Sequence, residues 1–119
     1  MSIRRRIASF RYAFQGLGDL FRSQVNARIH LAAVVVVAGA GIYFHISAME
    51  WVALVLCMSG VIALEALNTA LEYLTDLVSP DPHPLAGKAK DVAAAAVLIM
   101  ALGAVVVAAL IFGPRLVAL

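Results

Sequence analysis

The sequence predicts an all-α membrane protein with three transmembrane helices and an N-terminal amphipathic surface helix. Of its 119 residues, 64% are hydrophobic and only 13% are charged, whereas soluble domains average about 45–50% apolar and about 25% charged residues. The apolar residues are gathered in long blocks, and a helix needs about 20 predominantly apolar residues to cross a bilayer. Three blocks meet that requirement, so we expect a single membrane domain with three spans.

The first segment, about residues 2–28, has the pattern of a helix that lies on the membrane surface. Its apolar side chains recur at steps of three and four residues, and its arginines lie mostly off that stripe. The stripe comprises Ile7, Phe10, Phe14, Leu17 and Phe21. The pattern predicts an interfacial anchor, and by itself it indicates no further role.

Three apolar blocks follow the surface segment. The middle block is uncharged from Trp51 as far as Leu64, so it must continue into the polar stretch EALNTALEYLTD to leave the membrane. The last block is closed by Gly113 and Pro114. We therefore expect spans at about 29–48, 50–78 and 90–112, with a cytoplasmic turn at 79–89.

Basic residues predict the orientation, because they accumulate on the cytoplasmic side near the ends of spans. The turn HISAME after the first span carries no Lys or Arg, whereas Lys88 and Lys90 lie between the second and third spans. Six arginines precede the first span: Arg4, Arg5, Arg6, Arg11, Arg22 and Arg28. We expect the N-terminus and the second turn to face the cytoplasm. Because these bases lie beside spans, they give little support to nucleic-acid binding.

The end of the second span carries a single polar stripe. At about 100° per residue, Glu65, Asn68, Glu72 and Asp76 lie within roughly 80° of one another, and they climb about 16 Å along the axis. An ionisable group costs about 2.5–3.5 kcal/mol at the bilayer centre on insertion scales, so three carboxylates on one face indicate a function. Two structural alternatives remain open: a helix that emerges into water at Asp76, and a helix–helix seam held by Asn68 and Thr69.

The second turn and the start of the third span add groups that suit a bound polyphosphate. Pro80, Pro82 and Pro84 favour an extended turn, and Lys90 and Asp91 open the span. Opposite a stripe of carboxylates, a lysine and a carboxylate can hold a polyphosphate with its divalent metal ion, since hard cations prefer oxygen ligands. Each residue also has a simpler interpretation: Asp91 would interact favourably with the helix dipole, and Lys90 would contact lipid headgroups.

Known nucleotide and zinc motifs are absent from the sequence. The stretch AGKAK is not a P-loop, because Pro82 stands where the first glycine is needed and Ala89 where Ser or Thr is needed. The single Cys57 excludes a disulfide, and no His/Cys cluster suggests zinc. The small residues Ala93 to Ala96 would let a lipid or another helix approach closely, and Ala94 is our candidate for contact with a lipid substrate.

Two stretches, EALNTALEYLTDL and HPLAGKAKDVAAAAVL, resemble the signature of the small prokaryotic diacylglycerol kinase family, which includes undecaprenol kinases. The stretches RYAFQGL and NARIHL are also similar to the family, so the resemblance covers nearly the whole chain. It implies a homotrimer in the bacterial inner membrane with active sites shared between protomers. It also implies phosphorylation of a lipid hydroxyl from Mg-ATP at the cytoplasmic interface.

The resemblance assigns roles residue by residue. Glu65 resembles the family's catalytic base, which also meets the lipid, and Asn68 resembles its close companion. Glu72 resembles a metal ligand. The implied ATP site comprises Arg5, Tyr12, Glu72, Asp76, Asp81, Pro82, His83, Lys90 and Asp91. One position departs from the family, because Gln24 stands where a second metal-binding carboxylate is usual. An amide oxygen can ligate Mg²⁺, but it carries no charge and should bind the ion more weakly.

These observations predict an ATP- and Mg²⁺-dependent lipid kinase with Glu65 as general base. The stretches SAMEWVAL, with Glu50 and Trp51, and SPDPHPLA resemble the undecaprenol kinases more than the enterobacterial-type enzymes. Undecaprenol is therefore favoured over diacylglycerol. Two other classes remain open. A small oligomeric transporter or proton pathway would show flux that depends on Glu65 without ATP consumption. In a non-catalytic membrane assembly protein, substitution of Glu65 would alter oligomerisation instead.

Overall fold

The computed structural model describes residues 2–119, and that part of the chain is built from α-helices without a strand. This confirms the predicted all-α class. The helices are α1 (Ile3–Ser23), α2 (Val25–Tyr43), α3 (Ala48–Val78) and α4 (Pro84–Val117).

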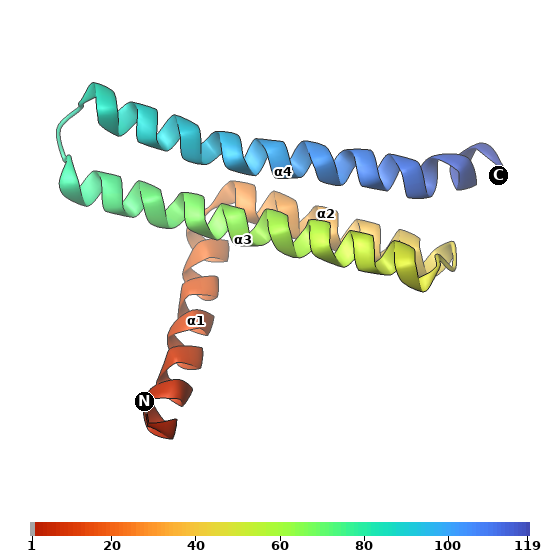
Figure 1. Ribbon diagram of the computed structural model, residues 1–119, viewed down its shortest axis with the longest axis horizontal. Helices are drawn as coiled ribbons and strands as arrows, with labels where there is room; N and C mark the ends of the chain where they lie inside the picture. The colour runs from red at the N-terminus through yellow and green to blue at the C-terminus, as the bar shows by residue number, and fades with distance from the viewer. Residues whose placement is uncertain (1) are drawn as a thin grey trace.

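The helices α2, α3 and α4 form a bundle, and α1 points away from it crosswise (Figure 1). The long helices α3 and α4 run antiparallel along each other, and α2 packs against α3. Each of the three is long and apolar enough to cross a membrane, which confirms the three expected spans. With 31 residues, α3 is about 46 Å long. Since a bilayer core is about 30 Å thick, part of α3 must extend beyond the hydrocarbon.

The apolar stripe of α1 is not covered by the rest of the chain. Ile7, Phe10 and Phe14 are 64%, 70% and 70% exposed, whereas Leu20, near the end of the helix, is buried. The helix therefore meets the bundle through its last turns and leaves its apolar side free. An exposed apolar stripe on a helix that lies across the spans suits contact with a lipid surface.

The boundary between α1 and α2 differs from the expected one. The surface helix was expected to continue to about residue 28, but it ends at Ser23, and Gln24 has an extended backbone with φ −111° and ψ 115°. The guanidinium of Arg28 donates hydrogen bonds to the carbonyl oxygens of Phe21 and Arg22, at 3.4 and 3.1 Å. These bonds satisfy carbonyls at the end of α1, which have no partner within their own helix, and so stabilise the change of direction.

The turn between α3 and α4 is shorter than the expected 79–89. Helix α4 begins at Pro84 rather than near residue 90. Proline is well suited to the first position of a helix, because the N–H that it lacks would have no intrahelical partner there. His83 caps the helix, and its Nδ1 accepts a hydrogen bond of 3.1 Å from the backbone N–H of Leu85.

The far end of α4 also extends beyond the expected boundary at residue 112. Pro114 lies inside the helix, which continues to Val117. The Arg115 guanidinium donates to both carboxylate oxygens of Glu50 on α3, at 2.8 and 2.9 Å. This bidentate ion pair holds the last turn of α4 against α3. Its stabilisation offsets the free-energy cost of a proline within a helix.

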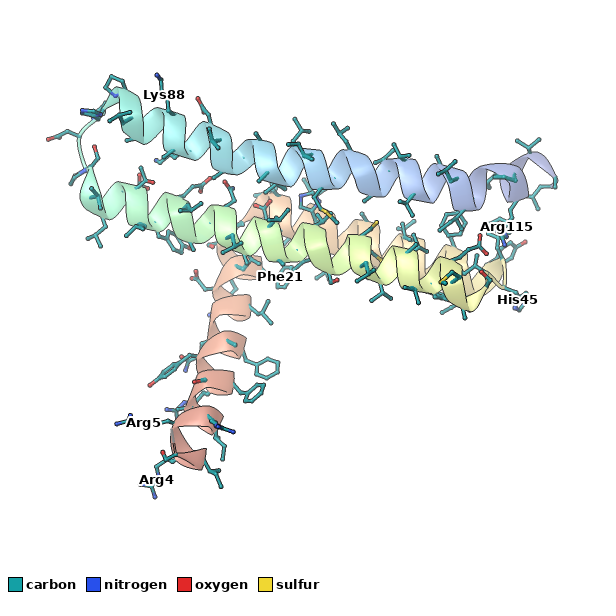
Figure 2. The ribbon with its side chains drawn as sticks, viewed as in Figure 1. Arg4, Arg5, Phe21, His45, Lys88 and Arg115 are labelled. Atoms are coloured by element: carbon teal, nitrogen blue, oxygen red, sulfur yellow. The ribbon has the colours of Figure 1, made fainter. Side chains whose placement is uncertain are left out.

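The loop between α2 and α3 lies at the same end as Arg115, opposite Lys88 (Figure 2). Ser47 and Glu50 form a capping box that starts α3. A Cβ atom on Gly41 would lie 2.6 Å from Cη2 of Trp51, so this close approach of α2 and α3 requires glycine.

Candidate active site

The polar stripe of α3 runs from the interior of the protein to its surface. Glu65 is 2% exposed and Asn68 is 9% exposed, whereas Glu72 is half-buried and the Asp76 side chain is 64% exposed. The exposure of the four residues therefore rises toward the α3–α4 turn. A carboxylate as buried as that of Glu65 is costly to keep charged unless a partner compensates it.

The basic side chain that faces Glu65 is His30 of α2. Its Nε2 lies 3.7 Å from Oε2 of Glu65, and its side chain is 22% exposed. The sequence prediction did not include His30. The signal that could have found it is a titratable residue in the early turns of an otherwise apolar span, because such residues are rare in membranes and usually have a role.

Asn68 links the buried and exposed halves of the stripe. Its Nδ2 donates a hydrogen bond of 3.3 Å to Oε1 of Glu72. Its Oδ1 and the hydroxyl oxygen of Thr69 are buried and have no partner among the described residues. Buried polar atoms are nearly always hydrogen-bonded, so the Asn68 oxygen is available to a hydroxyl donor or a metal ion.

The exposed end of the stripe meets α4. Lys90 Nζ lies 2.6 Å from Oδ1 of Asp76. These two side chains line a cavity of about 330 Å³ together with Asp81, Pro82 and His83 of the turn. Five residues expected at the ATP site are therefore adjacent in one chain. The pair is exposed, so it contributes little to stability and is accessible to a charged ligand.

The other expected site residues lie farther from this cavity or face outward. Asp91 and Ala94 are exposed on α4, so a ligand or a second chain can reach both. Arg5 lies near the free end of α1, distant from Lys88 within one chain (Figure 2). Tyr12 is on the same helix and is 62% exposed. Within a single chain, Arg5 and Tyr12, the residues of α1 that were expected to contact ATP, are therefore not brought to the α3–α4 turn.

The residues expected to hold a metal ion supply few protein ligands. The described residues contain no group of three or more His, Cys, Asp or Glu side chains placed to bind a metal. Gln24 is half-buried at the break between α1 and α2, and Glu72 offers a carboxylate. Mg²⁺ commonly binds through one or two carboxylates, with phosphate and water oxygens as its remaining ligands, so this oxygen-only set fits a metal that arrives with a nucleotide.

A second cluster absent from the sequence prediction joins α1 to α3. The Tyr73 hydroxyl donates a hydrogen bond of 2.7 Å to Oδ2 of Asp19 and lies 3.1 Å from the Ser23 hydroxyl. Tyr73 directly follows Glu72 in the chain. The cluster therefore ties the end of the surface helix to α3 at the level of the expected metal ligand.

Comparisons with known proteins place the chain in a family. Residues 11–112 match the family model described as prokaryotic diacylglycerol kinase. The chain is 38% identical to an undecaprenol kinase of Bacillus subtilis, covering 96% of this chain and 93% of that one. It is 43% identical to a diacylglycerol kinase of Synechocystis, over 95% of this chain and 65% of the relative. It is 30% identical to the diacylglycerol kinase of Escherichia coli K12, over 80% of this chain and 78% of the relative. The chain therefore belongs to the prokaryotic diacylglycerol kinase family, which makes it a lipid kinase.

Proposed function

We propose that this protein transfers the γ-phosphoryl group of ATP to the hydroxyl of a membrane lipid, with undecaprenol as the preferred acceptor. The observation that carries the proposal is the order of groups along α3. Glu65 is buried among apolar helices, and Asp76 meets Lys90 at the exposed end. A lipid hydroxyl comes from the bilayer and ATP comes from water, so a lipid kinase needs its base and its phosphate-binding groups at opposite ends of such a stripe.

Glu65 acts as the general base in this proposal. The hydroxyl O–H bond breaks and its proton passes to the carboxylate, while the oxygen attacks the γ-phosphorus and ADP leaves. The hydroxyl donates its one hydrogen to Glu65, so the partnerless Oδ1 of Asn68 remains an oxygen ligand for the metal ion. Phosphoryl transfer requires mainly alignment and charge stabilisation from a protein, which a small helical chain can supply.

The polar cavity at the α3–α4 turn holds the phosphates. Lys90 offers a positive charge once a phosphate competes for it with Asp76. Glu72 and Gln24 would hold Mg²⁺, which neutralises phosphate charge when bound. Glu72 is already oriented by the amide of Asn68, so these two residues of the stripe are in direct contact.

The protein functions as a homotrimer in this proposal, with its N-terminus and the α3–α4 turn in the cytoplasm. The support is the direction of α1, which carries Arg5 away from the chain's own turn (Figure 2), and Tyr12 belongs to the same helix. In an oligomer the same helix can reach the nucleotide site of a neighbour. The exposed Ala94 likewise lies where a neighbour or a lipid can pack.

Undecaprenol is preferred because the likeness to the Bacillus subtilis undecaprenol kinase extends over nearly the whole of both chains. Identity alone does not rank the two lipids, since the Synechocystis diacylglycerol kinase is 43% identical. The preference therefore requires a direct competition experiment between the two acceptors.

The test is transfer of labelled phosphate from ATP to lipid by the purified protein in lipid nanodiscs. We expect labelling of undecaprenol above diacylglycerol at equal mole fraction. Glu65→Gln should lower the rate by about 100-fold or more, as expected for loss of a general base. Glu50→Gln is the matched control, because it makes the same chemical change at the opposite end of α3 and should keep the rate. Failure to label either lipid would overturn the kinase assignment.

A further inference from the structure

The carboxylate of Glu65 lies beside His30, which has no role in the proposed function. Glu65 is 2% exposed, and Nε2 of His30 lies 3.7 Å from its Oε2. The two residues are far apart in the sequence and come from different helices, α2 and α3. Their approach is therefore a product of helix packing.

A buried general base needs a polar partner that holds it in place. A carboxylate among apolar side chains has few groups that can fix its direction. The imidazole of His30 is the basic side chain beside Glu65, and its ring nitrogens can donate to or accept from a polar neighbour.

The surroundings of His30 leave this task to the histidine. It lines a cavity of about 300 Å³ between α2, α3 and α4 whose other walls include Val34, Leu54, Met58 and Ala104. Among the described residues, Cys57 is the only other titratable side chain on the cavity wall. The cavity side of His30 is therefore almost entirely apolar, whereas Glu65 lies 3.7 Å from its Nε2.

We propose that His30 is a positioning residue that holds the Glu65 carboxylate oriented toward the lipid hydroxyl. The inference rests on the proposed function, since it assigns His30 a role in orienting the base of that reaction. His30 itself does not contact ATP or the transferred phosphoryl group. Its loss should therefore reduce turnover and leave nucleotide binding unchanged.

Two substitutions separate the polar contact of His30 from its bulk. His30→Gln keeps a polar side chain that can donate a hydrogen bond to the carboxylate, and His30→Leu fills the space without a polar group. We expect kcat to fall roughly 10- to 100-fold in His30→Leu, as a share of what a general base contributes, with the KM for ATP changed less than about twofold. His30→Gln should retain more of the kcat than His30→Leu, because it keeps a polar partner for Glu65.

The matched control is His45→Asn. His45 lies in the loop after α2 (Figure 2) and has a positive φ of 51°, which asparagine tolerates well. This variant also removes a histidine, but at the opposite end of the bundle, and it should keep both kcat and the KM for ATP. Thermal unfolding in detergent establishes that each variant is folded.

The outcomes distinguish this inference from the proposed function. If the unmodified protein labels lipid and Glu65→Gln does not, but His30→Leu keeps the normal kcat, the role of His30 is refuted. A raised KM with normal kcat would also refute it, because His30 would then serve substrate binding. Unfolding of both His30 variants would count against it as well, since the position would then be structural. If the unmodified protein labels no lipid, the proposed function itself fails.

Discussion

Tyr73 of α3 donates a 2.7 Å hydrogen bond to Asp19 of α1, and this contact joins the surface helix to the helix that carries the polar stripe. Ser23 adds to the junction, because its hydroxyl lies 3.1 Å from that of Tyr73 and donates to the Asp19 carbonyl oxygen at 2.8 Å. Apart from this junction and the turn at Gln24, most of α1 projects freely from the bundle (Figure 1). The cluster therefore controls the angle between α1 and α3.

Tyr73→Phe should loosen the surface helix without unfolding the bundle. Loss of a hydrogen bond to a charged group at an exposed site should cost about 1 kcal/mol, which corresponds to about fivefold faster local opening. The measurement is amide hydrogen exchange over the second half of α1. Tyr43→Phe is the control, because Tyr43 is exposed at the far end of α2 and its loss should leave exchange in α1 unchanged. Equal exchange in both variants would show that the cluster does not hold α1.

Gly41→Ala should destabilise the protein, because the new methyl group would meet the Trp51 ring, with Cη2 at 2.6 Å. Overpacking of this kind costs about 1–3 kcal/mol. Gly39→Ala provides the comparison in the same helix, since a Cβ there has no neighbour within 4 Å. Thermal unfolding in detergent should show a lower melting temperature for the first variant only. A normal melting temperature for Gly41→Ala would mean that Trp51 moves aside at little cost.

Gln24→Glu should lower the Mg²⁺ concentration that gives the half-maximal rate. A carboxylate would restore the negative charge that the amide lacks, and Mg²⁺ binds charged oxygen ligands more tightly. Gln15→Glu makes the same change on the exposed part of α1 and should leave the Mg²⁺ requirement as it is. An unchanged requirement in Gln24→Glu would mean that position 24 is not a ligand.

The transmembrane arrangement was predictable because its signals are local. Blocks of about 20 apolar residues report a span whatever surrounds them, and the three spans are confirmed. The ends of the helices were less predictable. Pro84 was read as a helix breaker although it starts α4, and Pro114 was read as a stop although α4 continues to Val117. The cap from His83 stabilises the helix start at Pro84. The ion pair between Arg115 and Glu50 stabilises the turn that contains Pro114.

The sequence by itself determined the polar stripe of α3, because the 3.6-residue period places Glu65, Asn68, Glu72 and Asp76 on one face of any helix. The sequence also placed Lys90 opposite this stripe, but its contact with Asp76 is seen only in the structure. Only the tertiary structure decided that His30 faces Glu65 and that Tyr73 reaches Asp19. The physical reason is that helical periodicity sets positions around one axis, whereas the rotation and depth of one helix against another depend on how all their side chains pack.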